Sequence, residues 1–136
     1  MPQDIVKQQA VLEIKHFSKS YSKTKRAVDD LSLEVSAGDI FGFIGQNGAG
    51  KTTTLRAVTG VMDFTEGEIF IAGRSVKADP VACKSVTAYI PDNPDLYDFL
   101  TGVQYLNYIA DIFGVTQADR KERIEKYADM FRIRGD

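Results

Sequence analysis

One glycine-rich stretch carries residue types at the spacing of a phosphate-binding loop. It reads Gly45-Gln46-Asn47-Gly48-Ala49-Gly50-Lys51-Thr52-Thr53 and contains the pattern Gly-x-x-x-x-Gly-Lys-Thr. Glycines let the backbone approach a phosphate closely, so that successive N–H groups can face its oxygens. Lys51 would neutralise the outer phosphates as a point charge, and Thr52 would offer its hydroxyl to Mg²⁺. The sequence therefore predicts that this loop binds a phosphate-bearing ligand.

The segments on either side of the loop have the order that it needs. Residues 40–44 form a short apolar run between glycines, which is typical of a buried parallel strand. Residues 55–62 carry apolar side chains at helical spacing, and Gly60 can end the helix. The positive end of that helix would face the same anion. The alternative is a glycine-rich surface turn followed by an unrelated helix.

Length and composition indicate one ordinary soluble domain. The 136 residues are 43% apolar and 26% charged, and the net charge of -2 gives no reason to expect a nucleic-acid partner. The single cysteine, Cys83, excludes an internal disulfide and fits a reducing compartment. The N-terminus lacks the apolar core of a signal peptide, and no run approaches the roughly 18 apolar residues of a membrane span. We therefore expect a cytosolic protein that is able to dock on a membrane partner.

The N-terminal part of the chain has the pattern of β-structure. Residues 11–17 are rich in β-forming residues and alternate in part, residues 31–35 alternate cleanly, and both segments are predicted to be strands. The polar residues 18–26 between them, which include Tyr21, are predicted to be a loop. His16 has no second histidine or cysteine nearby, so a solvent-facing strand residue is favoured over a metal ligand or a base.

The middle of the chain is predicted to alternate strand, helix and strand. Residues 66–73 form a short strand between glycines, and residues 86–90 form a second candidate core strand. Between them, Asp79 and Pro80 predict the N-cap and the first residue of a short helix that runs through Lys84.

Two further helices are predicted towards the C-terminus. Thr101 and Gln104 match a capping box, and apolar residues then recur at helical spacing up to Gly114. Thr116 begins another helix, in which the charges within 119–126 lie mostly opposite an apolar face. A solvated face is the favoured interpretation of these charges.

Together these features resemble the N-terminal half of an ATP-binding-cassette (ABC) transporter ATPase. The resemblance covers nearly the whole chain from Val11. It rests on motifs in the family's order: an adenine-stacking aromatic at Tyr21, a strand at 27–35 that leads to the turn Gly38-Asp39, the phosphate loop at 45–53 with its doubled threonine, a hairpin at 67–73, a Q-loop beginning at 89–92 and the start of a helical subdomain at 100–106.

The resemblance implies an α/β fold with a P-loop NTPase core, an antiparallel β subdomain and the start of a helical subdomain. Residues 1–136 would be part of one ABC-type nucleotide-binding domain. The β subdomain and P-loop core would span 11–98, and the start of the helical subdomain 99–136. The cofactors would be ATP and Mg²⁺.

The family's functional residues carry over onto the matching positions. Tyr21 would stack on adenine, which needs only the ring, so that Tyr21→Phe should be nearly silent; a tyrosine that packs locally is the alternative. Lys51 would reach the β- and γ-phosphates, and Thr52 would bind Mg²⁺. The remaining positions would hold the α- and β-phosphates, largely through the backbone: Gly45, Asn47, Gly48, Ala49, Gly50 and Thr53.

Asp92 departs from the family pattern. It occupies the Q-loop position, where the family usually carries glutamine and sometimes glutamate. Aspartate is one methylene shorter, which shortens its reach to Mg²⁺ or to the attacking water. Two interpretations stay open for Asp92: a catalytic and metal-binding residue that acts through a water molecule, and a turn-former before Asn93.

Three later motifs of the family do not occur in the chain. They are the Ser-Gly-Gly signature, the apolar strand that ends in Asp-Glu, and the switch histidine. We therefore expect a truncated domain that binds ATP without hydrolysing it appreciably. Its C-terminal helices are expected to leave an apolar face uncovered.

By resemblance, the full-length protein would couple ATP binding and hydrolysis to transport across a membrane, with export favoured. Its partners would be transmembrane transporter subunits and a second nucleotide-binding domain, at the cytoplasmic face of the membrane, with no nucleic acid. Two alternatives stay open: a non-catalytic nucleotide-binding half-domain, and another P-loop enzyme such as a small-molecule kinase.

Overall fold

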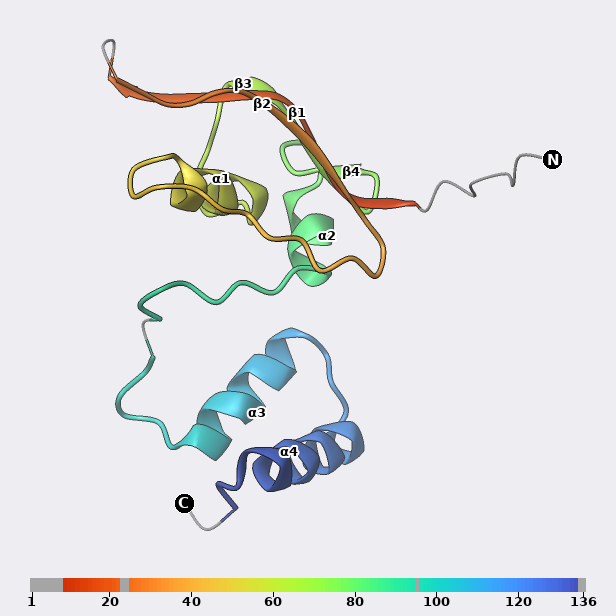
Figure 1. Ribbon diagram of the computed structural model, residues 1–136. Coiled ribbons are helices and arrows are strands. Elements are labelled where there is room, and N and C mark those ends of the chain that lie inside the picture. Colours follow the sequence, from red (N-terminus) through yellow and green to blue (C-terminus); the bar gives the residue numbers. More distant parts are fainter. Residues whose placement is uncertain (1–8, 23–24, 95, 135–136) are drawn as a thin grey trace, which may run out of the picture. The chain divides into compact units, whose positions relative to one another are not determined.

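Two units make up the part of the chain that the structure describes. The computed structural model describes residues 9–22, 25–94 and 96–134. It divides the chain into the units Met1–Tyr89 and Ile90–Asp136 (Figure 1). The first unit contains a sheet and two helices, and the second contains two helices.

The first unit is built on a four-stranded antiparallel sheet. Leu12 pairs with Val35 on one neighbouring strand and with Ile71 on the other, so the register is set on both sides of the central strand. The predicted strands at 11–17 and 31–35 are confirmed, as is a strand from residue 66. The strands lie in the order β2-β1-β3-β4, with bounds β1 Ala10–Ser22, β2 Lys25–Ser36, β3 Glu66–Ile71 and β4 Arg74–Ser75.

The hairpin of β1 and β2 is longer than the sequence predicts. The predicted loop at 18–26 is wrong, because Ser20 pairs with Arg26 and Ser22 pairs with Lys25 across the hairpin. Hydrogen bonds to a neighbouring strand hold a polar segment in a sheet where its side chains face solvent. Tyr21 therefore lies on β1, near the end of the strand.

A bend in this hairpin is marked by two residues with positive φ, His16 at 50° and Asp30 at 51°. The exposed His16 ring places Nδ1 2.8 Å from Oδ1 of Asp30. Gly67 on β3 passes so close to the bend that a Cβ atom there would lie 2.4 Å from the His16 carbonyl oxygen. Gly67 also has a φ of 83°, so only glycine fits without strain.

The helices α1, Lys51–Val58, and α2, Pro80–Ser85, lie on one side of the sheet (Figure 1). Asp79 accepts a hydrogen bond from the Ala82 N–H at the start of α2, which confirms the predicted N-cap. The core between sheet and helices consists of Ile14, Phe17, Val28, Ala57, Val58, Phe64, Ile69, Ile71, Val76 and Cys83. This core anchors α1, and with it the glycine-rich loop that precedes α1, to the sheet.

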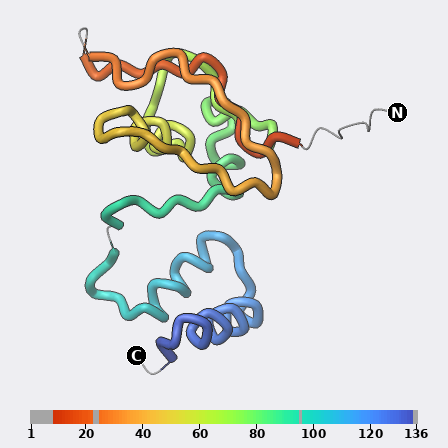
Figure 2. Tube along the Cα trace, in the orientation of Figure 1, coloured from red at the N-terminus to blue at the C-terminus, as the bar shows by residue number. Residues whose placement is uncertain are grey.

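Two apolar segments that were predicted to be core strands, 40–44 and 86–90, belong to no strand. Figure 2 traces the first of them between β2 and α1. The side chains of Ile40, Ile44 and Ile90 are 103%, 93% and 88% exposed. A buried parallel strand needs neighbours that bond its N–H and C=O groups. The described sheet contains only antiparallel pairs among β1 to β4, so apolar composition alone does not bury these segments.

The second unit contains α3, Gly102–Ile112, and α4, Gln117–Phe131. Thr101 and Gln104 form the predicted capping box, with both reciprocal hydrogen bonds present. Arg120 joins the two helices, since Nη2 donates to Oδ1 of Asp111 and to the Val115 carbonyl, each at 2.7 Å. No residue of either helix is buried, which agrees with the expected uncovered apolar face.

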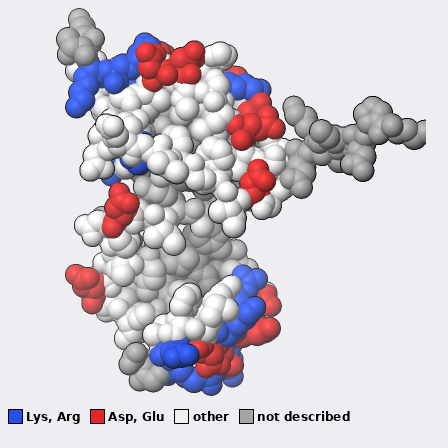
Figure 3. All heavy atoms as spheres, viewed as in Figure 1, with Lys and Arg blue, Asp and Glu red and all other residues white. Residues whose placement is uncertain are grey.

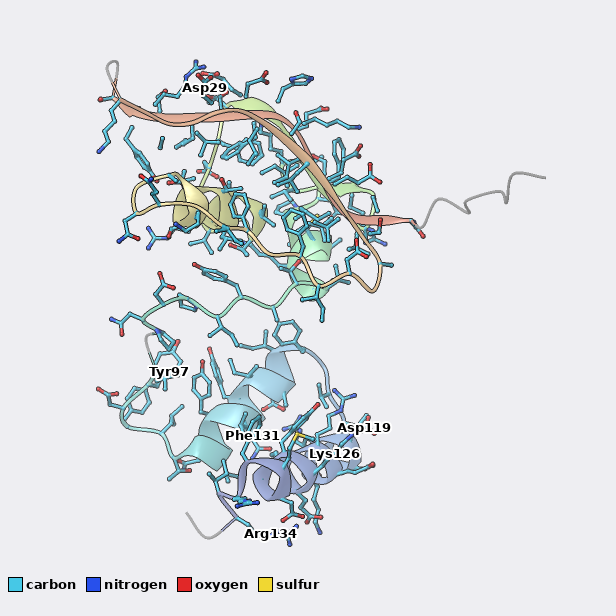
Figure 4. All side chains as sticks on the ribbon, in the orientation of Figure 1. Asp29, Tyr97, Asp119, Lys126, Phe131 and Arg134 are labelled. Atoms are coloured by element: carbon cyan, nitrogen blue, oxygen red, sulfur yellow. The ribbon has the colours of Figure 1, made fainter. Side chains whose placement is uncertain are left out.

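Charged residues cover α4 as predicted. Figure 3 shows basic and acidic side chains intermixed over this helix on the visible face, and Figure 4 shows Asp119 and Lys126 among them. Tyr127 and Phe131 stack on each other with ring centroids 6.4 Å apart. Of the helices in the described part of the chain, none is both long and apolar enough to cross a bilayer.

Candidate phosphate-binding site

The N-terminus of α1 differs from the other helix starts that the structure describes. Asp79, Thr101 and Thr116 cap α2, α3 and α4 through side-chain oxygens, whereas no side chain caps α1. Its N-cap is Gly50, with a φ of 86°. The first N–H groups of a helix have no acceptor within the helix, so those of α1 are available to an external anion. The positive end of the helix dipole favours the same ligand.

Glycines shape the loop that precedes α1. Gly50 is buried, and a Cβ atom on it would lie 2.4 Å from the Ala27 carbonyl oxygen and 2.8 Å from Cγ2 of Val28. Gly48 has a φ of 83°, with no atom within 4 Å of the position of its Cβ. The loop is therefore packed against β2 at Gly50 and open at Gly48, which leaves space on its outer side.

Lys51 lies against the opening of the loop. Its ammonium group donates to the carbonyl oxygens of Gly45 at 2.5 Å and Gln46 at 2.8 Å. The Ala49 N–H donates to the same Gln46 carbonyl at 3.1 Å, which closes a tight turn through Asn47 and Gly48. An ammonium group has three donors, so one remains for an anion held by the loop.

Three consecutive threonines in α1 have different environments. Thr54 is buried and donates to the Gly50 carbonyl at 3.0 Å, so it supports the helix start. Thr53 is 8% exposed, and its hydroxyl lies 3.2 Å from the Tyr21 hydroxyl. Thr52 is exposed, and its hydroxyl has no hydrogen-bond partner among the residues that the structure describes. Thr52 is therefore the hydroxyl that is free to act as a metal ligand.

The donor set around the loop fits Mg²⁺ held together with phosphate. Within residues 9–22, 25–94 and 96–134, no group of three or more His, Cys, Asp or Glu side chains is arranged to hold a metal ion. Mg²⁺ keeps several waters and is usually bound through one or two carboxylates plus substrate phosphates, and in phosphate-loop NTPases the Ser or Thr hydroxyl of the loop is a further ligand. Thr52 supplies the hydroxyl of this mode of binding, and residues 45–53 supply no carboxylate.

Tyr21 is brought to the phosphate loop from β1. Its ring is 61% exposed, and its hydroxyl contacts both Oγ1 of Thr53 at 3.2 Å and Sδ of Met62 at 3.3 Å. The Lys19 ammonium lies 5.9 Å from the ring centroid and donates to the Asp63 carbonyl at 2.7 Å. The exposed ring is available for stacking, while its hydroxyl is tied to α1.

Sequence reasoning missed Lys19 and Met62 as neighbours of Tyr21. Lys19 precedes Tyr21 by two residues on β1, and side chains two apart lie on the same face of a strand. A strand in place of the predicted loop would therefore have predicted this neighbour. Met62 follows α1 and was assigned only to the apolar pattern of the helix; no local signal connects it with Tyr21.

Asp92 lies in the second unit, in an exposed bend outside any helix or strand. Its catalytic and metal-binding role remains a prediction.

The same unit contains an unpredicted cavity lined by Tyr97, Phe99, Leu100, Gln104 and Tyr108. Figure 4 shows Tyr97 in the segment that precedes α3. The charge of a Tyr97 phenolate and its hydrogen bond raise the pKa of Tyr108. The high density of aromatic residues between 97 and 108 is the feature of the sequence that could have predicted this cavity.

Comparison with known proteins gives a consistent result. A family model described as ABC transporter matches residues 28–136. YhcH of Bacillus subtilis, an uncharacterised ABC transporter ATP-binding protein, is 37% identical over 121 residues, which cover 88% of this chain and 38% of that protein. EcsA of the same species, an ABC-type transporter ATP-binding protein, is 32% identical over 91% of this chain and 50% of its own length. The human phospholipid-transporting ATPase ABCA7 is 38% identical over 79% of this chain and 5% of that protein.

A solved structure gives the same match in three dimensions. The structure of an ATP binding subunit of an ABC transporter superposes with a TM-score of 0.83 at 32% sequence identity, covering 90% of this chain and 51% of that chain. This chain thus spans about half or less of the length of each of these proteins. The mixed α/β fold with its antiparallel sheet is the one predicted from the sequence. The chain belongs to the ABC transporter family, among its ATP-binding subunits and domains.

Proposed function

We propose that this chain binds ATP with Mg²⁺ through residues 45–53, as part of the nucleotide-binding domain of an ABC transporter. The observation that carries the proposal is the uncapped N-terminus of α1, which follows a glycine loop and begins at Lys51. The other helix starts in the described residues use a side chain for the same purpose. An anion is the ligand that these free N–H groups favour.

Each residue of the loop has a role in this proposal. The backbone from Gly48 to Thr52 faces the α- and β-phosphates, and Lys51 contacts the β- and γ-phosphates. Thr53 contacts the α-phosphate, and the exposed ring of Tyr21 stacks on adenine. The turn that contains Gly45, Asn47, Ala49 and Gly50 keeps these groups in place. When bound beside Thr52, Mg²⁺ supplies positive charge that offsets the charge of the phosphates.

The proposed division of the chain follows the family. Residues 11–98 supply the β subdomain and P-loop core, and 99–136 supply the start of a helical subdomain. The full-length protein is an ATPase that couples ATP binding and hydrolysis to transport, which we propose to be export. It works at the cytoplasmic face of a membrane, with transmembrane transporter subunits and a second nucleotide-binding domain as partners.

A binding experiment tests the first part of the proposal. The purified chain is titrated with ATP and Mg²⁺ while its thermal unfolding is followed. A ligand at 100 times its dissociation constant adds about 2.7 kcal/mol of stability when it binds only the folded state. Lys51→Ala should lose most of this shift. Lys121→Ala, which removes an exposed lysine from α4, should keep it and serves as the matched control. A folded chain that shows no shift with ATP or ADP would contradict nucleotide binding.

A turnover experiment tests the catalytic part. Phosphoryl transfer depends on positioning and on electrostatic groups around the γ-phosphate. The family's signature, Asp-Glu strand and switch histidine are not found among the 136 residues. Steady-state phosphate release by the chain alone should therefore equal that of Lys51→Ala. Turnover that Lys51→Ala abolishes would show that these residues suffice for hydrolysis, against the proposal.

A further inference from the structure

The hydroxyl of Tyr21 makes contacts that stacking on a base does not require. It lies 3.2 Å from Oγ1 of Thr53, and it donates to Sδ of Met62 at 3.3 Å. Thr53 lies in the first turn of α1 and is 8% exposed. The contact thus joins the end of β1 to the helix start that is free to bind an anion.

Two proton arrangements are possible for these hydroxyls, because the single proton of Tyr21 can serve either the Met62 contact or the Thr53 contact but not both. A phenol and an alcohol each carry one proton, and each can also accept a hydrogen bond. In the first arrangement, Thr53 donates to Tyr21, and Tyr21 donates to the sulfur of Met62. In the second arrangement, Tyr21 gives up its hydrogen bond to Met62 and donates to Thr53, so the Thr53 hydroxyl is free to donate its own hydrogen bond to a third group. Only the second arrangement lets Thr53 act as a donor towards a bound phosphate.

A phosphate oxygen at the start of α1 would favour the second arrangement. A charged oxygen is a much better acceptor than a phenol oxygen, and a thioether sulfur is a weak acceptor. Donation from Tyr21 also polarises the Thr53 hydroxyl, since hydrogen bonds in a chain strengthen one another. The chain of donors would run from Tyr21 through Thr53 to the phosphate.

We propose that the Tyr21 hydroxyl is a positioning group that orients the Thr53 proton towards a phosphate oxygen of the bound nucleotide. The proposal rests on the nucleotide binding proposed above and adds a second role to the ring. Lys19 supports this position, because its ammonium lies beside the Tyr21 ring and is held by the Asp63 carbonyl. Tyr21→Phe is therefore expected to weaken binding, in contrast to the silent substitution that stacking alone predicts.

Calorimetric titration with ATP and with tripolyphosphate, both with Mg²⁺, tests the proposal. Tripolyphosphate has no base, so stacking does not contribute to its binding. Tyr21→Phe and Tyr21→Ala should weaken tripolyphosphate binding equally, by about two- to tenfold, the range for one neutral hydrogen bond. For ATP, Tyr21→Ala should lose more than Tyr21→Phe, because it removes the ring as well. Tripolyphosphate affinity that is unchanged in both variants would overturn the proposal.

A double-mutant cycle provides a second readout on ATP itself. Thr53→Val removes the receiving hydroxyl and keeps the side-chain shape. The double variant Tyr21→Phe with Thr53→Val should bind ATP as weakly as Thr53→Val alone, because the pair acts as a unit. Additive losses would refute the relay, that is, the proposed chain of hydrogen bonds from Tyr21 through Thr53 to the phosphate. Where tripolyphosphate binds too weakly to be measured, this cycle is the deciding test. If Thr53→Val does not fold, the comparison of Tyr21→Phe with wild type on ATP decides instead.

Met62→Leu separates the relay from simple support of the ring. It removes the competing sulfur acceptor at similar volume, so ATP affinity should stay the same or rise. A loss as large as that of Tyr21→Phe would assign the effect to the Met62 contact and overturn the relay. If wild-type protein is folded and binds no ATP, the proposed function fails. If wild type binds ATP and Tyr21→Phe binds it equally well, only the relay fails.

Discussion

Replacement of Gly50 by alanine should distort the phosphate loop more than any other single methyl group added there. The new Cβ atom would lie 2.4 Å from the Ala27 carbonyl oxygen, and this contact has to open to about 3.0 Å before it is tolerable. Overpacking of this kind typically costs about 1–3 kcal/mol. The left-handed backbone, with a φ of 86°, adds roughly 1–2 kcal/mol for a residue with a side chain. We expect Gly50→Ala to lower the free energy of unfolding by about 2–5 kcal/mol.

Two other glycines serve as matched controls. Gly48→Ala has the same backbone strain, with a φ of 83°, and no atom within 4 Å of the added Cβ. It should lower the free energy of unfolding by about 1–2 kcal/mol only. Gly67→Ala has both the strain and a clash, at 2.4 Å from the His16 carbonyl oxygen, in the sheet rather than in the loop. It should destabilise the chain as much as Gly50→Ala and leave the ATP affinity of the folded protein unchanged.

Urea denaturation and calorimetric titration with ATP and Mg²⁺ measure the two quantities separately. Gly50→Ala should lower both stability and affinity, since the segment that must move is the one proposed to hold the phosphates. The reasoning is refuted if Gly50→Ala and Gly48→Ala are equally stable, because the contact with Ala27 then has no energetic consequence. It is also refuted if Gly50→Ala and Gly67→Ala bind ATP equally well, because loop geometry then does not govern binding.

Three further predictions concern the loop and the second unit. Lys51→Arg keeps the charge but replaces a compact ammonium group with a planar guanidinium group, so ATP affinity measured by calorimetry should fall at least about tenfold. An affinity equal to that of the wild type would contradict the tight fit of Lys51 at the loop carbonyls. Thr101→Ala removes the capping box of α3 and should cost about 1 kcal/mol in urea denaturation followed by circular dichroism, whereas no change would show that the cap is dispensable. Tyr97→Phe should lower the raised pKa of Tyr108, measured by alkaline absorbance titration. An unchanged titration midpoint for Tyr108 would contradict this prediction. Because that pKa is raised in the folded chain, its contribution to stability is present below the ordinary tyrosine pKa of about 10 and is lost as the pH rises through the higher folded value.

Local signals predicted the parts of the fold that depend on neighbours in sequence. The predicted caps at Asp79 and Thr101 are present because each needs only a side-chain oxygen and an N–H group three residues later. Thr116, where a helix start was predicted, caps α4 in the same way. Gly60 and Gly114 both adopt positive φ after α1 and α3, as helix-ending glycines do. The phosphate loop is likewise recognised from contiguous residues, and the binding of a phosphate by them remains a prediction.

Features that depend on distant neighbours could not be predicted in this way. Residues 40–44 and 86–90 have the composition of buried strands, but burial depends on which strands pair with them. The end of the β1–β2 hairpin is polar, yet it is a strand because its partner is adjacent. The contact of Tyr21 with Thr53 joins residues 32 positions apart. Motif order suggested that Tyr21 belongs to the site, but only the folded chain shows where its hydroxyl lies.

The exposed segment 40–44 has a consequence for how the chain behaves in solution. Its five residues include no charge and no proline, and Ile40 and Ile44 are almost fully exposed. Short uncharged β-forming segments with free backbone groups pair readily with copies of themselves. Asp39 directly precedes this segment, and Pro91 directly follows the other exposed apolar segment, 86–90. Charged residues and prolines in such flanking positions oppose this pairing. We expect aggregation of the chain, followed by light scattering, to rise steeply with its concentration and to be slowed by Phe41→Lys, which places a charge within the segment.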